Sequence, residues 1–94
     1  MKYIKTTSSN NLEIFLEFFL EVDEKYLEKR KIELADGNLL GFAGGDIEFN
    51  GTTLAKEPLL TLVEINALPN IKAQEIDKEE FEDLWNRVME LALP

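Results

Sequence analysis

The sequence predicts an α+β domain in which an antiparallel meander sheet of four to five strands carries a short helix and a C-terminal amphipathic helix, both packed on one face. Three features support this prediction. Apolar residues alternate along residues 12–22, the dipeptide Asp36-Gly37 is typical of a hairpin turn, and the last third contains two capped helix starts. A length of 94 residues fits one domain spanning 1–94.

Residues 12–22, LEIFLEFFLEV, form the predicted central strand. The even-numbered positions of this segment are all apolar: Leu12, Ile14, Leu16, Phe18, Leu20 and Val22. Because side chains alternate across a strand, these residues share one face that can be buried. A helix is the alternative, since Leu12, Phe15 and Leu16 also fit helical spacing, but the content of Phe, Ile and Val favours a strand.

Three further segments complete a predicted four-stranded antiparallel meander over residues 1–43. These segments are residues 2–7, 26–35 and 38–43, and polar turn-forming residues separate the first two from the central strand. Asp36-Gly37 joins the last two segments, because both of its residues can adopt a positive φ.

The chain after the meander is less regular. Asn50-Gly51 is a second dipeptide typical of hairpins, and we expect it to join short arms at 46–49 and 52–55. Residues 71–76, IKAQEI, are a predicted fifth strand.

Both helices begin at recognisable caps. Thr61 is the predicted N-cap of the first helix, Glu64 completes a capping box, and Pro69 limits the length of the helix. Asp77 is the predicted cap of the second helix, with Glu80 as its third residue. Apolar residues of the second helix then follow helical spacing: Phe81, Leu84, Trp85, Val88, Leu91 and Ala92. We expect this stripe to pack on the even-numbered face of residues 12–22.

The composition restricts the chemistry that the chain can perform. It contains neither Cys nor His, which removes thiol nucleophiles, imidazole acid–base catalysis and the usual zinc sites. With 19 acidic and 10 basic residues the net charge is −9, and such a surface repels nucleic acid and anionic membranes but attracts basic partners. No segment has the length of a signal peptide core or of a membrane span, so we expect a cytoplasmic protein.

Two segments suggest ligand sites but have simpler interpretations. Residues 41–46, GFAGGD, are glycine-rich but lack the spacing and the Lys of a phosphate loop, which favours a strand end and a turn. Acidic residues gather at 75–80, where helix capping and the helix dipole already account for them. We therefore expect no enzymatic activity, no metal and no cofactor.

The second face of the central strand is the predicted functional surface. If the helices cover the even-numbered face, Phe15 and Phe19 lie exposed among acidic residues, as in a binding patch for a basic protein. The predicted partner-binding residues are Glu13, Phe15, Glu17, Phe19 and Glu21, with a second acidic patch at Glu79, Glu82 and Asp83. Cover by residues 44–60, or a homodimer contact through the two rings, is the alternative.

Several segments resemble a family of small uncharacterised bacterial proteins that are often found near polymorphic-toxin genes. The resemblance lies in MKYIK, EKRKIELADGNLLGFA, GTTLAKEPLLTLVEINA and QEIDKEEFEDLW, and its best matches include Arg30, Lys31, Asp36-Gly37, Glu57-Pro58 and Trp85. This resemblance implies an immunity-like protein that binds and neutralises a toxin. The expected function is thus a non-enzymatic acidic protein-binding module that neutralises a basic toxin domain. A small homo-oligomeric regulatory or structural protein is the alternative.

Overall fold

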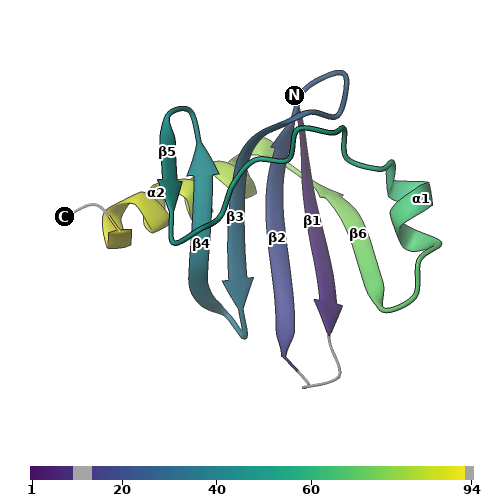
Figure 1. The fold of residues 1–94 in the computed structure, drawn as a ribbon, viewed down its shortest axis with the longest axis horizontal. Helices are drawn as coiled ribbons and strands as arrows, with labels where there is room; N and C mark the ends of the chain where they lie inside the picture. The colour runs from purple at the N-terminus through teal and green to yellow at the C-terminus, as the bar shows by residue number, and fades with distance from the viewer. Residues whose placement is uncertain (10–13, 93–94) are drawn as a thin grey trace.

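The computed structural model describes residues 1–9 and 14–92 and has the predicted α+β architecture. Its elements are β1 (Lys2–Ser9), β2 (Phe15–Val22), β3 (Glu28–Ala35), β4 (Asn38–Gly44), β5 (Ile47–Phe49), α1 (Leu62–Asn66), β6 (Ile71–Ile76) and α2 (Lys78–Ala92). The six strands form one antiparallel sheet in the order β5-β4-β3-β2-β1-β6 (Figure 1). No helix within these residues is long and apolar enough to cross a membrane.

The meander β1–β4 confirms the prediction for the first half of the chain. β2 is a strand and not a helix, and it pairs with β1 on one side and β3 on the other. Asp36 (φ 50°) and Gly37 (φ 81°) form the tight turn between β3 and β4. The turn is also tied to β2, because the Phe15 N–H donates to Asp36 Oδ1 (2.9 Å) and the Asp36 N–H donates to the Phe15 carbonyl (2.8 Å). Residues 12 and 13 of the predicted strand lie outside the described residues.

The predicted hairpin through Asn50-Gly51 is wrong. Both residues have a positive φ, 58° and 84°, but residues 52–55 form no strand. β5 instead folds back on β4 through a turn at Gly45. The chain then leaves the sheet, and Thr52 passes so close to Gly41 that a Cβ on Gly41 would overlap the Thr52 hydroxyl. We call the segment that follows, residues 52–61, the strap.

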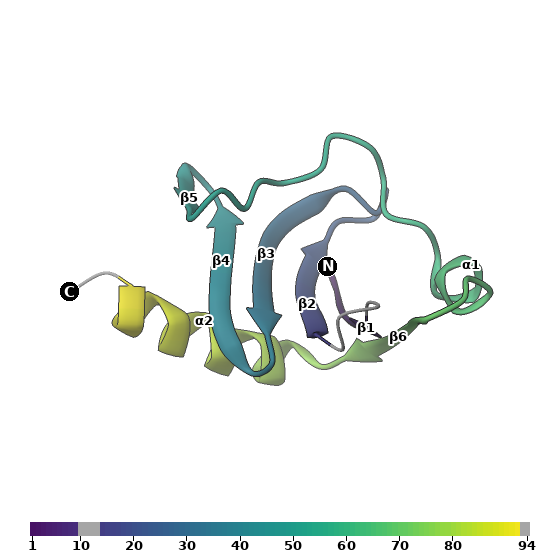
Figure 2. The ribbon, with the colours of Figure 1, turned by 60° about the horizontal axis from the view of Figure 1, so that its bottom comes forward.

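The two faces of the sheet are covered by different parts of the chain. α2 covers the face that carries Tyr3, Phe19, Ile32 and Phe42, which we call the helix face. The strap and α1 lie over the opposite face, the strap face, where Ile4, Leu20 and Val22 are buried. Figure 2 shows α2 along one side of the strands and the strap along the other.

The prediction that both helices pack on the even-numbered face of β2 is therefore wrong for α2, which packs on the odd-numbered face with Phe19, while α1 lies on the even-numbered face. The reason lies in the strand before the helix. Ile76, the last residue of β6, lies opposite Tyr3 in the sheet, and both side chains belong to the helix face. Because α2 starts at Lys78, directly after this strand, Phe81 is brought onto the same face and packs against Tyr3 at a ring distance of 5.3 Å.

Both predicted helix caps are present. In α1 the Glu64 N–H donates to Thr61 Oγ1 (3.2 Å) and the Thr61 N–H donates to Glu64 Oε1 (2.9 Å), which is a complete capping box. In α2 the Glu80 N–H donates to Asp77 Oδ1 (2.8 Å). These bonds satisfy donors that a helix start leaves without an intrahelical partner.

Two asparagine side chains bind backbone groups of the sheet, one on the outer strand β6 and one on the part of β4 that β5 does not pair with. Asn66, the last residue of α1, accepts from the Ala73 N–H (2.8 Å) and donates to the Ala73 carbonyl (2.9 Å) of β6. Asn50 donates to the Leu40 carbonyl of β4 (2.6 Å). The first pair of bonds also fixes α1 beside the sheet.

The two faces predict different outcomes for two alanine substitutions on β2. Phe19 is 7% exposed and Phe15 is 44% exposed. We expect Phe19→Ala to lower the free energy of unfolding by about 3–5 kcal/mol, because it empties the core beneath α2. Phe15→Ala should change it by less than about 1 kcal/mol. Urea denaturation of both variants measures the difference, and equal losses would contradict the assignment of Phe19 to the core.

Candidate functional site

The five residues predicted on β2 do not form one exposed patch. Phe15 is exposed, and Glu17 forms an ion pair with Lys5 (3.2 Å). Phe19 and Glu21 are buried on the helix face, so the expectation that they are exposed is wrong. Glu13 lies outside the described residues. The error follows from the position of α2, which covers the end of this face that carries Phe19 and Glu21 and leaves Phe15 uncovered.

Glu21 belongs instead to a charged network between the sheet and α2. Its carboxylate accepts two hydrogen bonds from the Arg30 guanidinium (2.8 Å each) and one from the Tyr3 hydroxyl (2.9 Å). Arg30 also pairs with Glu82 of α2 (2.7 Å). The guanidinium lies 4.9 Å from the ring centre of Phe81 and 5.1 Å from the Trp85 ring, a cation–π arrangement. The network thus joins β2, β3 and α2.

The same contacts set the protonation of these groups. Hydrogen bonds from Arg30 hold the pKa of Glu21 below its ordinary value, although burial acts in the opposite direction. Burial and the hydrogen bond to Glu21 raise the pKa of Tyr3. Hydrogen bonds to Glu21 raise the pKa of Arg30. The carboxylate and the guanidinium are therefore charged at neutral pH, and their role is structural.

The second predicted patch, on α2, is divided. Glu82 is held by Arg30, whereas Glu79 and Asp83 are exposed. Glu79 also lies in the first turn of α2, where negative charge stabilises the helix dipole. Two of the three predicted residues of this patch thus remain accessible to a partner.

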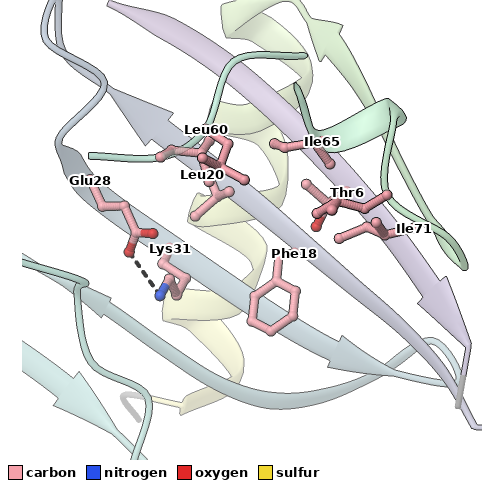
Figure 3. A pocket seen from close by; sticks show the side chains of 10 residues that line it. Thr6, Phe18, Leu20, Glu28, Lys31, Leu60, Ile65 and Ile71 are labelled. Atoms are coloured by element: carbon pink, nitrogen blue, oxygen red, sulfur yellow. Dashed lines mark ion pairs between the residues drawn. The ribbon is translucent and has the colours of Figure 1, made fainter. Parts of the chain in front are cut away.

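The strap face contains an apolar pocket that the sequence did not reveal. Its volume is about 280 Å³, and Figure 3 shows its walls. The lining residues are Thr6, Phe18, Leu20, Glu28, Lys31, Leu59, Leu60, Ile65, Leu68 and Ile71. The sheet supplies the floor, and the strap and α1 form one side. The apolar even-numbered residues of β2 indicated an apolar face. Only the tertiary structure shows that α2 does not cover this face and that the strap covers it incompletely.

The charged residues of the pocket already bind other groups. Lys31 pairs with Glu28 (2.7 Å) and donates to the Thr53 carbonyl (3.0 Å), while Glu28 accepts from the Ala55 N–H (2.9 Å). These bonds hold the strap on the sheet at one end, and the Leu59 N–H bond to the Tyr26 carbonyl (2.8 Å) holds it further along.

The pocket therefore offers an apolar surface with no unbonded charged group for a ligand to bind. Across residues 1–9 and 14–92, no buried side-chain nitrogen or oxygen lacks a hydrogen bond, and no three His, Cys, Asp or Glu residues form a metal site. The rim of the pocket is apolar and accessible, since Leu60 is 46% exposed and Leu68 is 47% exposed. Such a surface can bind another apolar group by burying it from water.

The network at Glu21 predicts a stability difference that depends on pH. Glu21→Gln removes a charge-assisted pair with Arg30, so it should lower the free energy of unfolding by about 1–3 kcal/mol at neutral pH. Because the pKa of Glu21 is lowered in the folded state, its stabilisation is complete above the ordinary carboxyl pKa and is lost as pH falls through the folded value. The gap between wild type and variant should therefore close in acid.

Denaturant unfolding of both proteins between neutral and acidic pH measures this gap. Glu48→Gln on β5 is the matched control, because Glu48 is exposed, lies far from any helix start and has no ion pair among the described contacts. A gap that stayed constant as pH fell would contradict the structural role of the Glu21 carboxylate.

Comparison with known proteins identifies the family. A family model described as a domain of unknown function, DUF6881, matches residues 3–90, from β1 to the last turns of α2. No curated protein and no solved structure matches the chain. The matched segment spans most of the chain and includes both the charged network and the pocket, so the chain is a member of the DUF6881 family.

Proposed function

We propose that this protein is a non-enzymatic, acidic protein-binding module. The pocket on the strap face is the observation that carries this proposal. A site for a polar metabolite presents several convergent polar groups, whereas the charged groups here bind each other and the strap. A protein-binding site commonly combines an apolar anchor pocket with a more polar surround.

The charge of the chain indicates the kind of partner. A net charge of −9 accelerates association with a basic protein and weakens contacts between two copies of the chain. This favours a basic partner over the alternative of a homo-oligomeric regulatory or structural protein. It also disfavours nucleic acid and anionic membranes as partners.

The specific form of the proposal is an immunity protein that neutralises a basic toxin domain in the cytoplasm. The resemblance of several segments to proteins found near polymorphic-toxin genes supports this form, although association with such genes is not a mechanism. Neutralisation of this kind requires only that the toxin surface be covered, so it needs no catalytic group on the covering protein.

Co-expression tests the proposal directly. The gene is expressed together with a neighbouring gene whose product contains a basic domain that stops growth of the host, and growth is compared with expression of that domain alone. We expect growth to be restored, and we expect calorimetry on the purified pair to show affinity that falls as salt rises. A toxin domain that stays active at equimolar protein would contradict the proposal, and elution of the free chain as an oligomer would favour the alternative.

A further inference from the structure

We propose that the pocket receives one bulky apolar side chain of the partner, and that Lys or Arg residues flank this side chain in the partner sequence. This inference rests on the proposed function, since it specifies what the partner presents to the pocket. The occupant is a segment of a basic protein and not a small metabolite or a second copy of the chain.

The size of the pocket supports a side chain as the occupant. Its volume of about 280 Å³ lies just below the range of about 300–1,000 Å³ that is usual for sites of drug-sized ligands. Buried residues line it, among them Thr6 and Leu20 on the sheet floor and Ile65 on the side formed by α1, so the packed core supports the pocket. A pocket of this volume has room for one bulky apolar side chain.

The bonding of the lining residues supports an apolar side chain in particular. Glu28 and Lys31 pair with each other at 2.7 Å, and their remaining bonds go to backbone groups of the strap. A polar group brought into the pocket would lose its bonds to water without replacement, which is unfavourable. An apolar group has no hydrogen bonds to water to lose, and its burial is favourable in free energy.

The residues around the opening of the pocket support the proposal that the flanking residues of the partner are basic. Leu60 and Leu68 line the pocket and are about half exposed, so a partner segment would cover them. Glu57 on the strap, Glu64 on α1 and Glu75 on β6 are exposed, against one exposed lysine on the strap, Lys56; Glu64 also accepts the capping hydrogen bond from the Thr61 N–H. Together with the net charge of −9, these carboxylates favour cationic residues beside the anchor and disfavour a second acidic copy.

Short peptides serve as defined probes of the pocket. The first has one leucine between two pairs of lysines, the second replaces leucine with serine, and the third replaces the lysines with glutamates. NMR spectra of methyl-labelled full-length protein report where each peptide binds. We expect the lysine–leucine peptide to shift the methyl signals of Leu20, Ile65 and Ile71 while those of Val88 and Ile32 stay unchanged. The serine and glutamate peptides should bind at least about tenfold more weakly.

Matched variants test whether the pocket itself is responsible. Leu60→Ser with Leu68→Ser should weaken binding of the lysine–leucine peptide at least about tenfold, whereas Leu91→Ser, on a 74% exposed side chain of α2, should change it less than about twofold. Ile71→Phe fills the pocket instead of emptying it and should also block the peptide. Melting temperatures show which variants fold, and the filled variant keeps the test valid if the serine variant unfolds.

The outcomes separate this inference from the proposed function. If the lysine–leucine peptide leaves the pocket signals unchanged at millimolar concentration, or if the folded pocket variants bind it as wild type does, the pocket is not the anchor site. If the peptide experiments are negative but the toxin domain is still neutralised, the inference is overturned and the proposed function is kept. Peptide binding in the pocket without neutralisation would overturn the immunity function and support the anchor site.

Discussion

β2 carries buried apolar side chains on both of its faces, and this constraint determines how the rest of the chain is arranged. The strand lies in the interior of the sheet, and the adjacent residues Phe19 and Leu20 are both buried, one on each face. Two apolar faces require cover on two sides. Among residues 1–9 and 14–92 the one long helix is α2, which covers one side. The strap and the five residues of α1 therefore cover the other side. Cover of this irregular kind is incomplete, and the pocket is the part of the strap face that it leaves open.

Arg30 connects this arrangement to the charge of the protein. A guanidinium placed between Glu21, Glu82 and two aromatic rings gives α2 one favoured position on the sheet, because the Glu21 carboxylate is buried and a buried charge without its partner is strongly unfavourable. Gly44 belongs to the same arrangement, since a Cβ at this position would lie 2.7 Å from Arg30 Cγ and 2.8 Å from the Trp85 ring. Some of the acidic residues that look like a binding surface in the sequence therefore stabilise the interior.

The elements that the sequence predicted correctly depend on local signals. The alternation along β2, the turn at Asp36-Gly37 and the caps at Thr61 and Asp77 each follow from interactions within a few residues. The Glu21–Arg30 pair could also have been found, because the two residues lie opposite each other once β2 and β3 are paired. The face that α2 covers could not have been predicted, because alternation does not show which of two faces with apolar side chains a helix will cover. Phe15 and Phe19 look equivalent in the sequence, and only the path of α2 makes one exposed and the other buried.

The two asparagines that bind backbone groups of β6 and of the unpaired part of β4 have a consequence for behaviour at high concentration. An outer strand normally presents free backbone groups to which a strand of another molecule can add, and repeated addition leads to fibres. The side-chain amide of Asn66 occupies the outward N–H and carbonyl of Ala73 as a neighbouring strand would, and Asn50 occupies the carbonyl of Leu40. Polymerisation of this kind would remove the protein from solution. These few hydrogen bonds thus disfavour the addition of a strand from another molecule at these positions of the sheet.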